Sequence, residues 1–217
     1  MRARMLLRAV IYDLDGTLID SRADLAASVN GMLRRMALPE HEQRIIESFI
    51  GEGAERLIRR SLGAHEDRYA EAAPLWREEY GARLLDQTRP YAGIEDALAL
   101  PPAARAVLTN KPGGFARRIL EGLGLARSFA QVIGGDEAPR KPSPDGLLRL
   151  CAALGAPPAE CLLVGDSTVD LATARAASVP FCAVLWGLGE RASLATADYL
   201  CREPADLVRL LRSFETP

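Results

Sequence analysis

Five short segments of apolar, largely β-branched residues run without alternation into a polar residue or a glycine, at residues 7–12, 105–108, 131–133, 161–164 and 181–185. Continuous apolar runs of this length are typical of strands that are buried on both faces of a parallel sheet. Amphipathic helical patterns follow the last four of these segments, at residues 112–123, 143–154, 168–177 and 204–214. Because strand and helix alternate, we predict an α/β fold with a doubly wound, Rossmann-like parallel sheet and right-handed crossovers.

One interval breaks this alternation. Between residues 21 and 88 there is helical periodicity without a convincing strand, at residues 23–36, 42–49, 54–61 and 67–85. The interval is too long to be a loop inside a compact domain. We therefore predict two parts, an α/β core of residues 1–20 and 89–217 and an inserted helical subdomain of residues 21–88.

Length and charge exclude several classes of protein. A chain of 217 residues suits one α/β domain with a modest insertion. A formal net charge of −2 provides no basic field for nucleic acid or an anionic membrane, and no run approaches the ~20 apolar residues that span a bilayer. We expect no signal peptide, because Arg8 interrupts the first apolar stretch and Asp13 ends it. The pattern indicates no particular oligomeric state.

The cysteines point to a reducing compartment. Four of them are widely spaced, at Cys151, Cys161, Cys182 and Cys201, and the chain has only two histidines. This spacing argues against a zinc site and against a disulfide framework. We predict a cytoplasmic protein whose cysteines are buried free thiols.

Two carboxylates follow the first predicted strand, which runs directly into Asp13-Leu14-Asp15-Gly16-Thr17. The carboxyl end of a parallel strand is where open α/β sheets bind ligands. Carboxylates this close repel each other and normally need a cation between them. Magnesium suits the position, because it prefers oxygen ligands and keeps waters that a phosphate can displace. A solvated Asp-Gly turn is the alternative interpretation.

Groups suited to a phosphate follow the next strands. Thr109, Asn110 and Lys111 precede a helix, so that a hydroxyl, an amide and free backbone N–H groups can bind an anion there. An ordinary N-cap threonine is the alternative. Lys141 is followed by Pro142-Ser143-Pro144, and the prolines fix the backbone so that this lysine can neutralise a phosphoryl group. The alternative is a lone surface lysine.

Two further acids follow the strand at residues 161–164. Asp166 stands at its end, and Asp170 lies one helical turn further on. Either acid alone could cap the helix that begins near Thr168. Together with Asp13 and Asp15, they are predicted to form an acidic metal pocket opposite the lysine and the threonine.

These clusters, in this order and at these strand ends, resemble the haloacid dehalogenase superfamily, and most specifically its phosphoglycolate phosphatase-like branch. The resemblance covers essentially the whole chain and rests on Asp-Leu-Asp-Gly-Thr-Leu-Ile-Asp-Ser, Pro-Tyr-Ala-Gly, Thr-Asn-Lys-Pro, Gly-Gly-Asp, Lys-Pro-Ser-Pro and Val-Gly-Asp-Ser. It implies that the inserted helices form a mobile cap. The chain departs from the pattern at Ala92, at Ser178 and in a shortened segment 97–105, where Pro101-Pro102 is expected to truncate a helix.

The resemblance also implies roles for the site residues. Asp13 is the nucleophile and Asp15 the general acid and base, while Thr109 and Lys141 bind the phosphoryl group. The expected magnesium ligands are Asp13, Asp15 through its carbonyl oxygen, and Asp166, with Asp170 in the same acidic pocket. Gly16, Thr17, Asn110 and Arg56 are expected to contact the substrate.

The resulting prediction is a magnesium-dependent phosphatase that hydrolyses a small phosphate monoester through an aspartyl-phosphate intermediate. 2-Phosphoglycolate is the leading substrate, with Arg56 on the helix predicted at 54–61 binding its carboxylate bidentately. The carboxylate at Asp15 favours hydrolysis, since dehalogenases lack one there. The alternatives are a sugar-phosphate mutase of the same superfamily and a catalytically idle binding or regulatory module.

Overall fold

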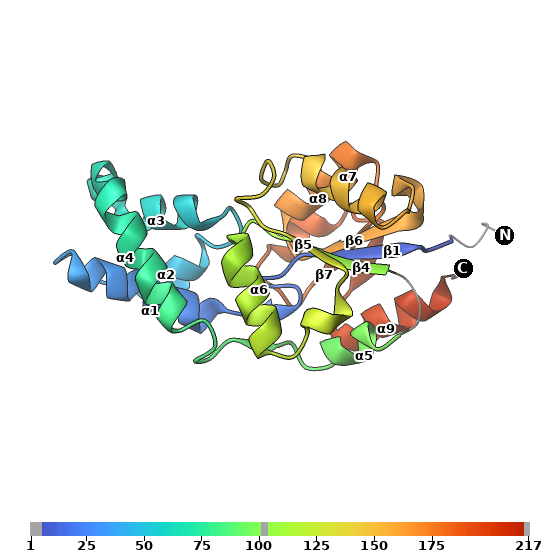
Figure 1. Ribbon diagram of the computed structural model, residues 1–217, viewed down its shortest axis with the longest axis horizontal. Coiled ribbons are helices and arrows are strands. Elements are labelled where there is room, and N and C mark those ends of the chain that lie inside the picture. Colours follow the sequence, from blue (N-terminus) through green and yellow to red (C-terminus); the bar gives the residue numbers. More distant parts are fainter. Residues whose placement is uncertain (1–5, 101–103, 215–217) are drawn as a thin grey trace.

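The computed structural model describes residues 6–100 and 104–214, which form a six-stranded sheet with helices on both faces (Figure 1). The strands are β1 (Ala9–Tyr12), β4 (Ala104–Leu108), β5 (Gln131–Ile133), β6 (Cys161–Gly165), β7 (Phe181–Val184) and β8 (Tyr199–Cys201). Their order across the sheet is β5-β4-β1-β6-β7-β8, and every neighbouring pair is parallel. The predicted doubly wound α/β fold is confirmed.

Alternate residues of β1 enter two different hydrophobic clusters, one on each face of the sheet. Ala9 and Ile11 pack with buried residues of α7 (Asp145–Ala153) and α8 (Thr168–Ala177). Val10 and Tyr12 belong to a cluster with residues of α6 (Gly113–Gly122) and α9 (Pro204–Ser213). Both faces of the strand are therefore covered, which is the physical reason for its unalternating apolar sequence.

Several short elements were not predicted from the sequence. They are β8 and the antiparallel pair of β2 (Ile19–Asp20) and β3 (Arg89–Pro90), whereas α5 (Ile94–Leu98) is the short helix expected before Pro101-Pro102. Short 3₁₀ turns also occur as η1 (Gly63–Arg68), η2 (Ala126–Ser128), η3 (Pro158–Glu160) and η4 (Arg191–Leu194). Elements of two to six residues are too short to produce a periodic signal. Pro101 and Pro102 lie outside the described residues, and α5 ends shortly before them.

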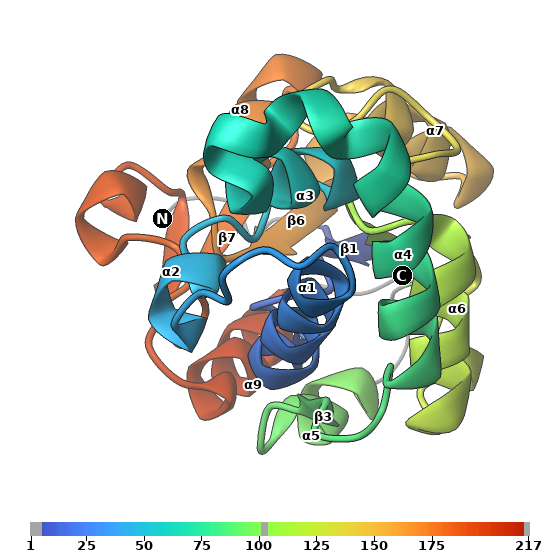
Figure 2. The same cartoon turned by 90° about the vertical axis from the view of Figure 1, so that its left-hand side faces the viewer.

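The inserted segment is helical, as predicted. It contains α1 (Arg22–Arg35), α2 (Gln43–Glu47), α3 (Ala54–Leu62) and α4 (Tyr69–Ala82), which follow β2 and precede β3. These helices gather at one end of the molecule, the end toward which β1 runs (Figure 1), and Figure 2 views the molecule from their side. Within the described residues, no helix combines the length and the apolar character needed to cross a membrane.

An aromatic cluster joins the inserted helices to the core. Trp76 and Tyr80 of α4 stack with their ring centroids 5.2 Å apart, and Phe115 of α6 meets Tyr80 edge-on, also at 5.2 Å. The same hydrophobic cluster continues into β1 through Tyr12. The division into a core of residues 1–20 and 89–217 and a cap of residues 21–88 stays a prediction, and the aromatic contact shows that the two proposed parts pack tightly.

Candidate active site

Three neighbouring strands deliver polar side chains to one edge of the sheet. β1 leads to Asp13, β4 to Thr109 and β6 to Asp166, and these strands are adjacent in the order β4-β1-β6. Because the strands are parallel, their carboxyl ends meet at the edge that faces the inserted helices. The site therefore forms where the sequence pattern places it.

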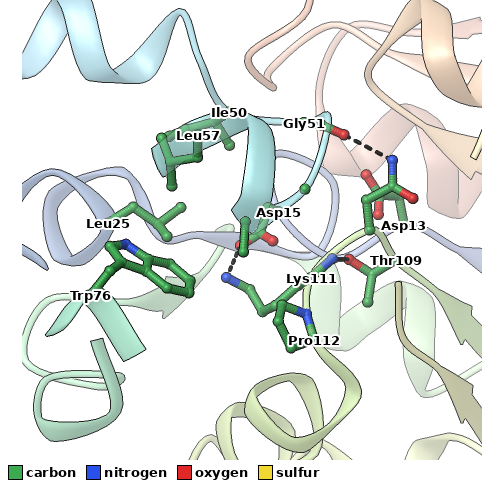
Figure 3. Close-up of a pocket in the computed structure, with 13 residues that line it drawn as sticks. Asp13, Asp15, Leu25, Ile50, Gly51, Leu57, Trp76, Thr109, Lys111 and Pro112 are labelled. Carbon is green, nitrogen blue, oxygen red and sulfur yellow. Dashed lines mark hydrogen bonds and ion pairs between the residues drawn. The ribbon is translucent and has the colours of Figure 1, made fainter. Parts of the chain in front are cut away.

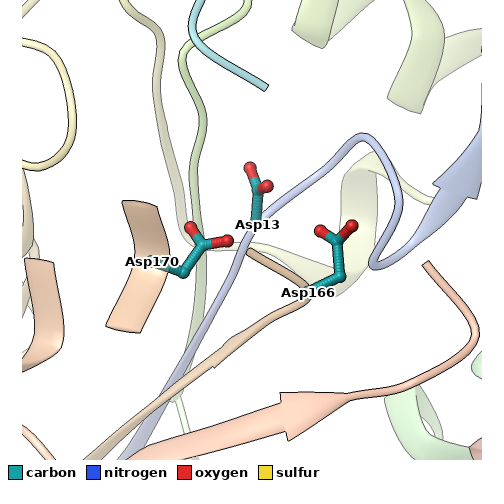
Figure 4. Close-up of side chains that lie close together, drawn as sticks. All are labelled: Asp13, Asp166 and Asp170. Carbon is teal, nitrogen blue, oxygen red and sulfur yellow. The ribbon is translucent and has the colours of Figure 1, made fainter. Parts of the chain in front are cut away.

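The carboxylates of Asp13, Asp166 and Asp170 lie together, with one oxygen atom of each within 4.8 Å of the others (Figure 4). All three residues are buried, at 7%, 3% and 0% exposure. The amine of Lys141 lies among them, with its Nζ 2.8 Å from Oδ1 of Asp13 and 2.6 Å from Oδ1 of Asp170. One buried cation thus faces three buried acids.

Burial and crowding disfavour the charged forms of these acids. Burial, together with the neighbouring Asp170 and Asp166, raises the pKa of Asp13 to about 8 although Lys141 opposes the shift. Burial and Asp170 likewise raise the pKa of Asp166 to about 6. A divalent cation would relieve this repulsion, and carboxylate oxygens are its preferred ligands. The residues present therefore fit a divalent metal.

A turn and a loop hold Asp166 in place. The hydroxyl of Thr17 donates to Oδ1 at 3.1 Å, and the backbone N–H of Leu188 donates to Oδ2 at 2.7 Å. Gly16 has a positive φ of 85°, and a Cβ at Gly16 or at Gly187 would overlap the Asp166 side chain. Both glycines are needed because the backbone passes too close to this carboxylate for any side chain.

Asp170 takes part in the N-terminal cap of α8 as well as in the acidic cluster. Its side chain accepts from the backbone N–H of Ser167 at 3.2 Å, and the Ser167 hydroxyl accepts from the backbone N–H of Asp170. This capping box begins α8 and directs the other carboxylate oxygen toward Lys141. Asp170 therefore caps α8 and also belongs to the acidic cluster, so both interpretations of this residue from the sequence are correct.

The carboxylate of Asp15 points to a second cation, Lys111 (Figure 3). Nζ of Lys111 lies 3.0 Å from Oδ1 of Asp15 and donates to the hydroxyl of Tyr80 at 2.5 Å. Ser21 also donates to Asp15. Burial lowers the pKa of Lys111, but the Asp15 carboxylate and the Tyr80 hydroxyl outweigh it, so that the pKa lies above the usual value for lysine.

Asn110 connects the cap to the core through backbone groups. Its amide nitrogen donates to the carbonyl oxygens of Gly51 at 3.2 Å and Lys141 at 3.1 Å, and its amide oxygen accepts from the backbone N–H of Lys141 at 2.9 Å. The hydroxyl of Thr109 accepts from the backbone N–H of Lys111 at 3.1 Å. Asn110 thereby positions the backbone on both sides of the site.

A cavity with about 430 Å³ of unfilled space, including its open mouth, lies between the strand ends and the inserted helices (Figure 3). The strand ends contribute its polar wall, with Asp13, Asp15, Thr109, Asn110, Lys111 and Pro112. The inserted segment contributes Leu25, Ile50, Gly51, Gly53, Ala54, Leu57 and Trp76. The cavity is thus charged on one side and apolar on the other.

Comparison with known proteins agrees with this geometry. A family model described as haloacid dehalogenase-like hydrolase matches residues 10–184. The chain belongs to this family. It is 37% identical to the phosphoglycolate phosphatase of Chromobacterium violaceum, an alignment that covers 95% of this chain and 97% of that protein. The phosphoglycolate phosphatase of Neisseria meningitidis is also 37% identical, over 88% of this chain and 86% of its own.

A solved structure shows the same fold. The crystal structure of a predicted phosphoglycolate phosphatase from Haemophilus somnus superposes with a TM-score of 0.89 at 28% identity, covering 94% of this chain and 98% of that one. The predicted superfamily, its phosphoglycolate phosphatase-like branch and the class of phosphoric monoester hydrolase are confirmed.

The structure of this hydrolase brings most of the predicted site residues together. Asp13, Asp15, Thr109 and Asn110 line the cavity, while Lys141, Asp166 and Asp170 surround Asp13. The side chain of Asp15 is outside the group of three clustered carboxylates that fit a metal and contacts Lys111 instead. Gly16 and Thr17 lie against Asp166.

Arg56 is not brought to the cavity in this structure. Its side chain is 61% exposed and is paired with Glu52, which also binds Arg60. The alternative for Arg56, a position on the solvated face of α3, describes where it lies in this structure. A mutual i,i+4 pairing with Glu52 was visible in the sequence and favours this outcome.

Sequence reasoning missed a role for Lys111, for Tyr80 and for the segment from Trp186 to Gly189. Lys111 is one of only two lysines in the chain and directly follows the predicted anion site, which was a usable signal. No sequence signal pointed to Tyr80, because an aromatic residue at helical spacing is ordinarily part of the hydrophobic core. The segment after β7 acts through backbone N–H groups, which no side-chain pattern reveals.

Proposed function

We propose that this hydrolase is a magnesium-dependent phosphatase that cleaves a small phosphate monoester through an aspartyl-phosphate on Asp13. The observation that carries the proposal is the position of Asp13, which lines the cavity and has the amine of Lys141 2.8 Å from its carboxylate. A carboxylate can attack a phosphoryl group only where the repulsion between the two negative groups is offset. A buried lysine at this distance provides such an offset.

The chain's own residues suggest a two-step reaction. A carboxylate oxygen of Asp13 would form a bond to phosphorus while the bond from phosphorus to the leaving oxygen breaks. Asp15, two residues away on the same turn, would donate a proton to that oxygen and then accept one from the water that hydrolyses the intermediate. Thr109 and Lys141 would bind the equatorial phosphoryl oxygens.

The proposed metal site consists of Asp13, Asp166 and Asp170, with the carbonyl oxygen of Asp15. Magnesium bound there would supply positive charge against the phosphoryl oxygens. The high pKa of Asp13, about 8, supports a role for a cation, since its charged form is costly in this pocket without one.

We propose 2-phosphoglycolate as the leading substrate. The relatives at 37% identity carry the name phosphoglycolate phosphatase, and the cavity is small and closed on one side by the inserted helices. Residues 21–88 would act as the cap, excluding water from competing positions. The four buried free cysteines support the proposed cytoplasmic location.

The sugar-phosphate mutase is the second candidate, and an assay separates the possibilities. We expect purified enzyme to release phosphate from 2-phosphoglycolate with magnesium and not after exhaustive chelation. A mutase would instead transfer the phosphoryl group between hydroxyls of a sugar phosphate, and an idle module would do neither. Phosphate release that continues at full rate in chelator would contradict the metal requirement.

The proposed double role of Asp15 is tested by rapid quench. We expect Asp15→Asn to slow both the formation and the decay of the phosphoenzyme, because the same side chain donates the first proton and accepts the second. Wild-type rates for both steps would assign the proton transfers to another group.

A further inference from the structure

Lys111 differs from the other cations of the chain in its location. It follows β4 directly and is 6% exposed. Among the described residues that line the cavity, it is the only one with a positive charge, since Lys141 contacts Asp13 without lining the cavity and Arg56 is paired with Glu52 at the surface. A substrate in the cavity therefore has one lysine within reach beyond the group that faces Asp13.

The contacts of Lys111 hold its amine at the cavity wall. Two of its three N–H groups have partners, the carboxylate of Asp15 at 3.0 Å and the hydroxyl of Tyr80 at 2.5 Å, and the amine lies 4.6 Å from the centre of the Tyr80 ring. Its third N–H has no partner among residues 6–100 and 104–214, and the side chain lines the cavity. The amine is thus oriented in advance and can still donate.

The remaining walls leave few other places for a polar substituent. Leu25, Ile50 and Leu57 are apolar. Trp76 lines the cavity at 2% exposure, and its indole N–H has no hydrogen-bond partner among the described residues. An anionic group in the apolar part would be buried without a partner, at considerable cost. Among the described lining residues, Lys111 offers the one positive charge that can balance such a group.

From these positions we propose that Lys111 binds the second anionic group of the substrate, a carboxylate, and so determines specificity for small phosphate esters with two negative groups. This inference rests on the proposed phosphatase function and assigns to Lys111 the role that the sequence suggested for Arg56. Tyr80 of the inserted helices is a positioning residue, because its hydroxyl contacts the Lys111 amine.

The test compares two esters of equal size. 2-Phosphoglycolate carries the carboxylate, and its amide, 2-phosphoglycolamide, is neutral at the same position. We expect the wild-type enzyme to prefer the carboxylate, and Lys111→Met to lower kcat/KM for 2-phosphoglycolate by roughly 10- to 100-fold more than for the amide, the range for a lost charged hydrogen bond. Arg77→Met, which removes an exposed cation from α4, is the matched control and should leave the ratio unchanged.

The outcomes separate the two proposals. No magnesium-dependent hydrolysis of either ester by the wild type would overturn the phosphatase function itself. Hydrolysis of both esters with equal kcat/KM would leave the phosphatase and overturn the role of Lys111. An equal loss on both esters in Lys111→Met, or a selective loss in Arg56→Met alone, would also overturn it.

A second measurement covers the case in which Lys111→Met does not fold, since it leaves the largely buried Asp15 charge without its cationic partner. Asp15→Asn is expected to slow turnover enough for binding to be measured, and Asp15→Asn/Lys111→Met removes both charges of the pair together. Calorimetry with magnesium should show that the single variant binds 2-phosphoglycolate at least 10-fold more tightly than the amide. The double variant should lose that preference, and an unchanged preference would contradict the proposal.

Discussion

Opposing electrostatic effects act on the carboxyl group of Asp13. Lys141 favours its charged form, whereas burial and two nearby acids disfavour it, and the net effect raises its pKa from 3.8 to about 8. A carboxyl group whose pKa is higher in the folded than in the unfolded state destabilises the fold when it is charged. This cost grows as the pH rises from about 4 to about 8 and is constant above that.

We therefore predict that Asp13→Asn abolishes turnover and stabilises the metal-free protein. The melting temperature in chelator should exceed that of the wild type at pH 8, by about 2–4 °C for each kcal/mol relieved, and the difference should shrink toward pH 5. Calorimetry at both pH values measures it. A variant that melts lower than the wild type at pH 8 would show that the ion pair with Lys141 outweighs the repulsion.

Asp24 anchors the chain where the inserted segment returns to the core. It is 1% exposed, and its carboxylate accepts from the backbone N–H groups of Gln87 and Thr88 and from the Thr88 hydroxyl. Asp24→Ala would leave these buried donors without a partner. We predict a loss of at least about 2 kcal/mol in the free energy of unfolding, measured by urea denaturation. The exposed Asp67→Ala is the control and should change stability by less than about 0.5 kcal/mol.

At the scale of elements, the loop after β7 supports the proposed metal site through backbone N–H groups. Its backbone N–H groups at Leu188 and Gly189 donate to Asp166, and Trp186 donates its indole N–H to the carbonyl oxygen of Thr17. The loop therefore fixes both the carboxylate and the turn beside it. Contacts of this kind orient metal ligands.

Gly187 is a position in this loop where a side chain would press directly on Asp166. A Cβ there would overlap Asp166 and the carbonyl oxygen of Gly16. We predict that Gly187→Ala raises the magnesium concentration for half-maximal activity by about 10-fold or more. Gly114→Ala, where a Cβ meets nothing within 4 Å, should leave that concentration unchanged. Equal magnesium curves for both variants would rule out the supporting role of the loop.

At the scale of the whole molecule, the proposed cap and core share one hydrophobic cluster. It contains Trp76 and Tyr80 from the inserted helices together with Phe115 from α6 and Tyr12 from β1. We predict a single calorimetric unfolding transition, with equal calorimetric and van't Hoff enthalpies, because neither part can expose its share of this cluster without the other. Two resolved transitions would mean that the cap unfolds independently.

The sheet, the inserted helices and the polar residues at the strand ends could be predicted from the sequence alone. Apolar runs, helical periodicity and polar strand ends depend on residues close together in the chain, so they are visible in the sequence. Asp13, Thr109 and Asp166 converge because adjacent parallel strands end at one edge of the sheet. The short edge strand β8 was not predicted.

Only the tertiary structure decided which charges meet. Lys141 pairs with Asp13 and Asp170, and Lys111 pairs with Asp15 and Tyr80 from a separate helix. Arg56, which the sequence suggested for the substrate, pairs instead with Glu52 at the surface. Which carboxylate a buried lysine pairs with depends on which carboxylates are buried beside it. Segments far apart in the chain determine that burial together, so the pairing cannot be seen in the sequence.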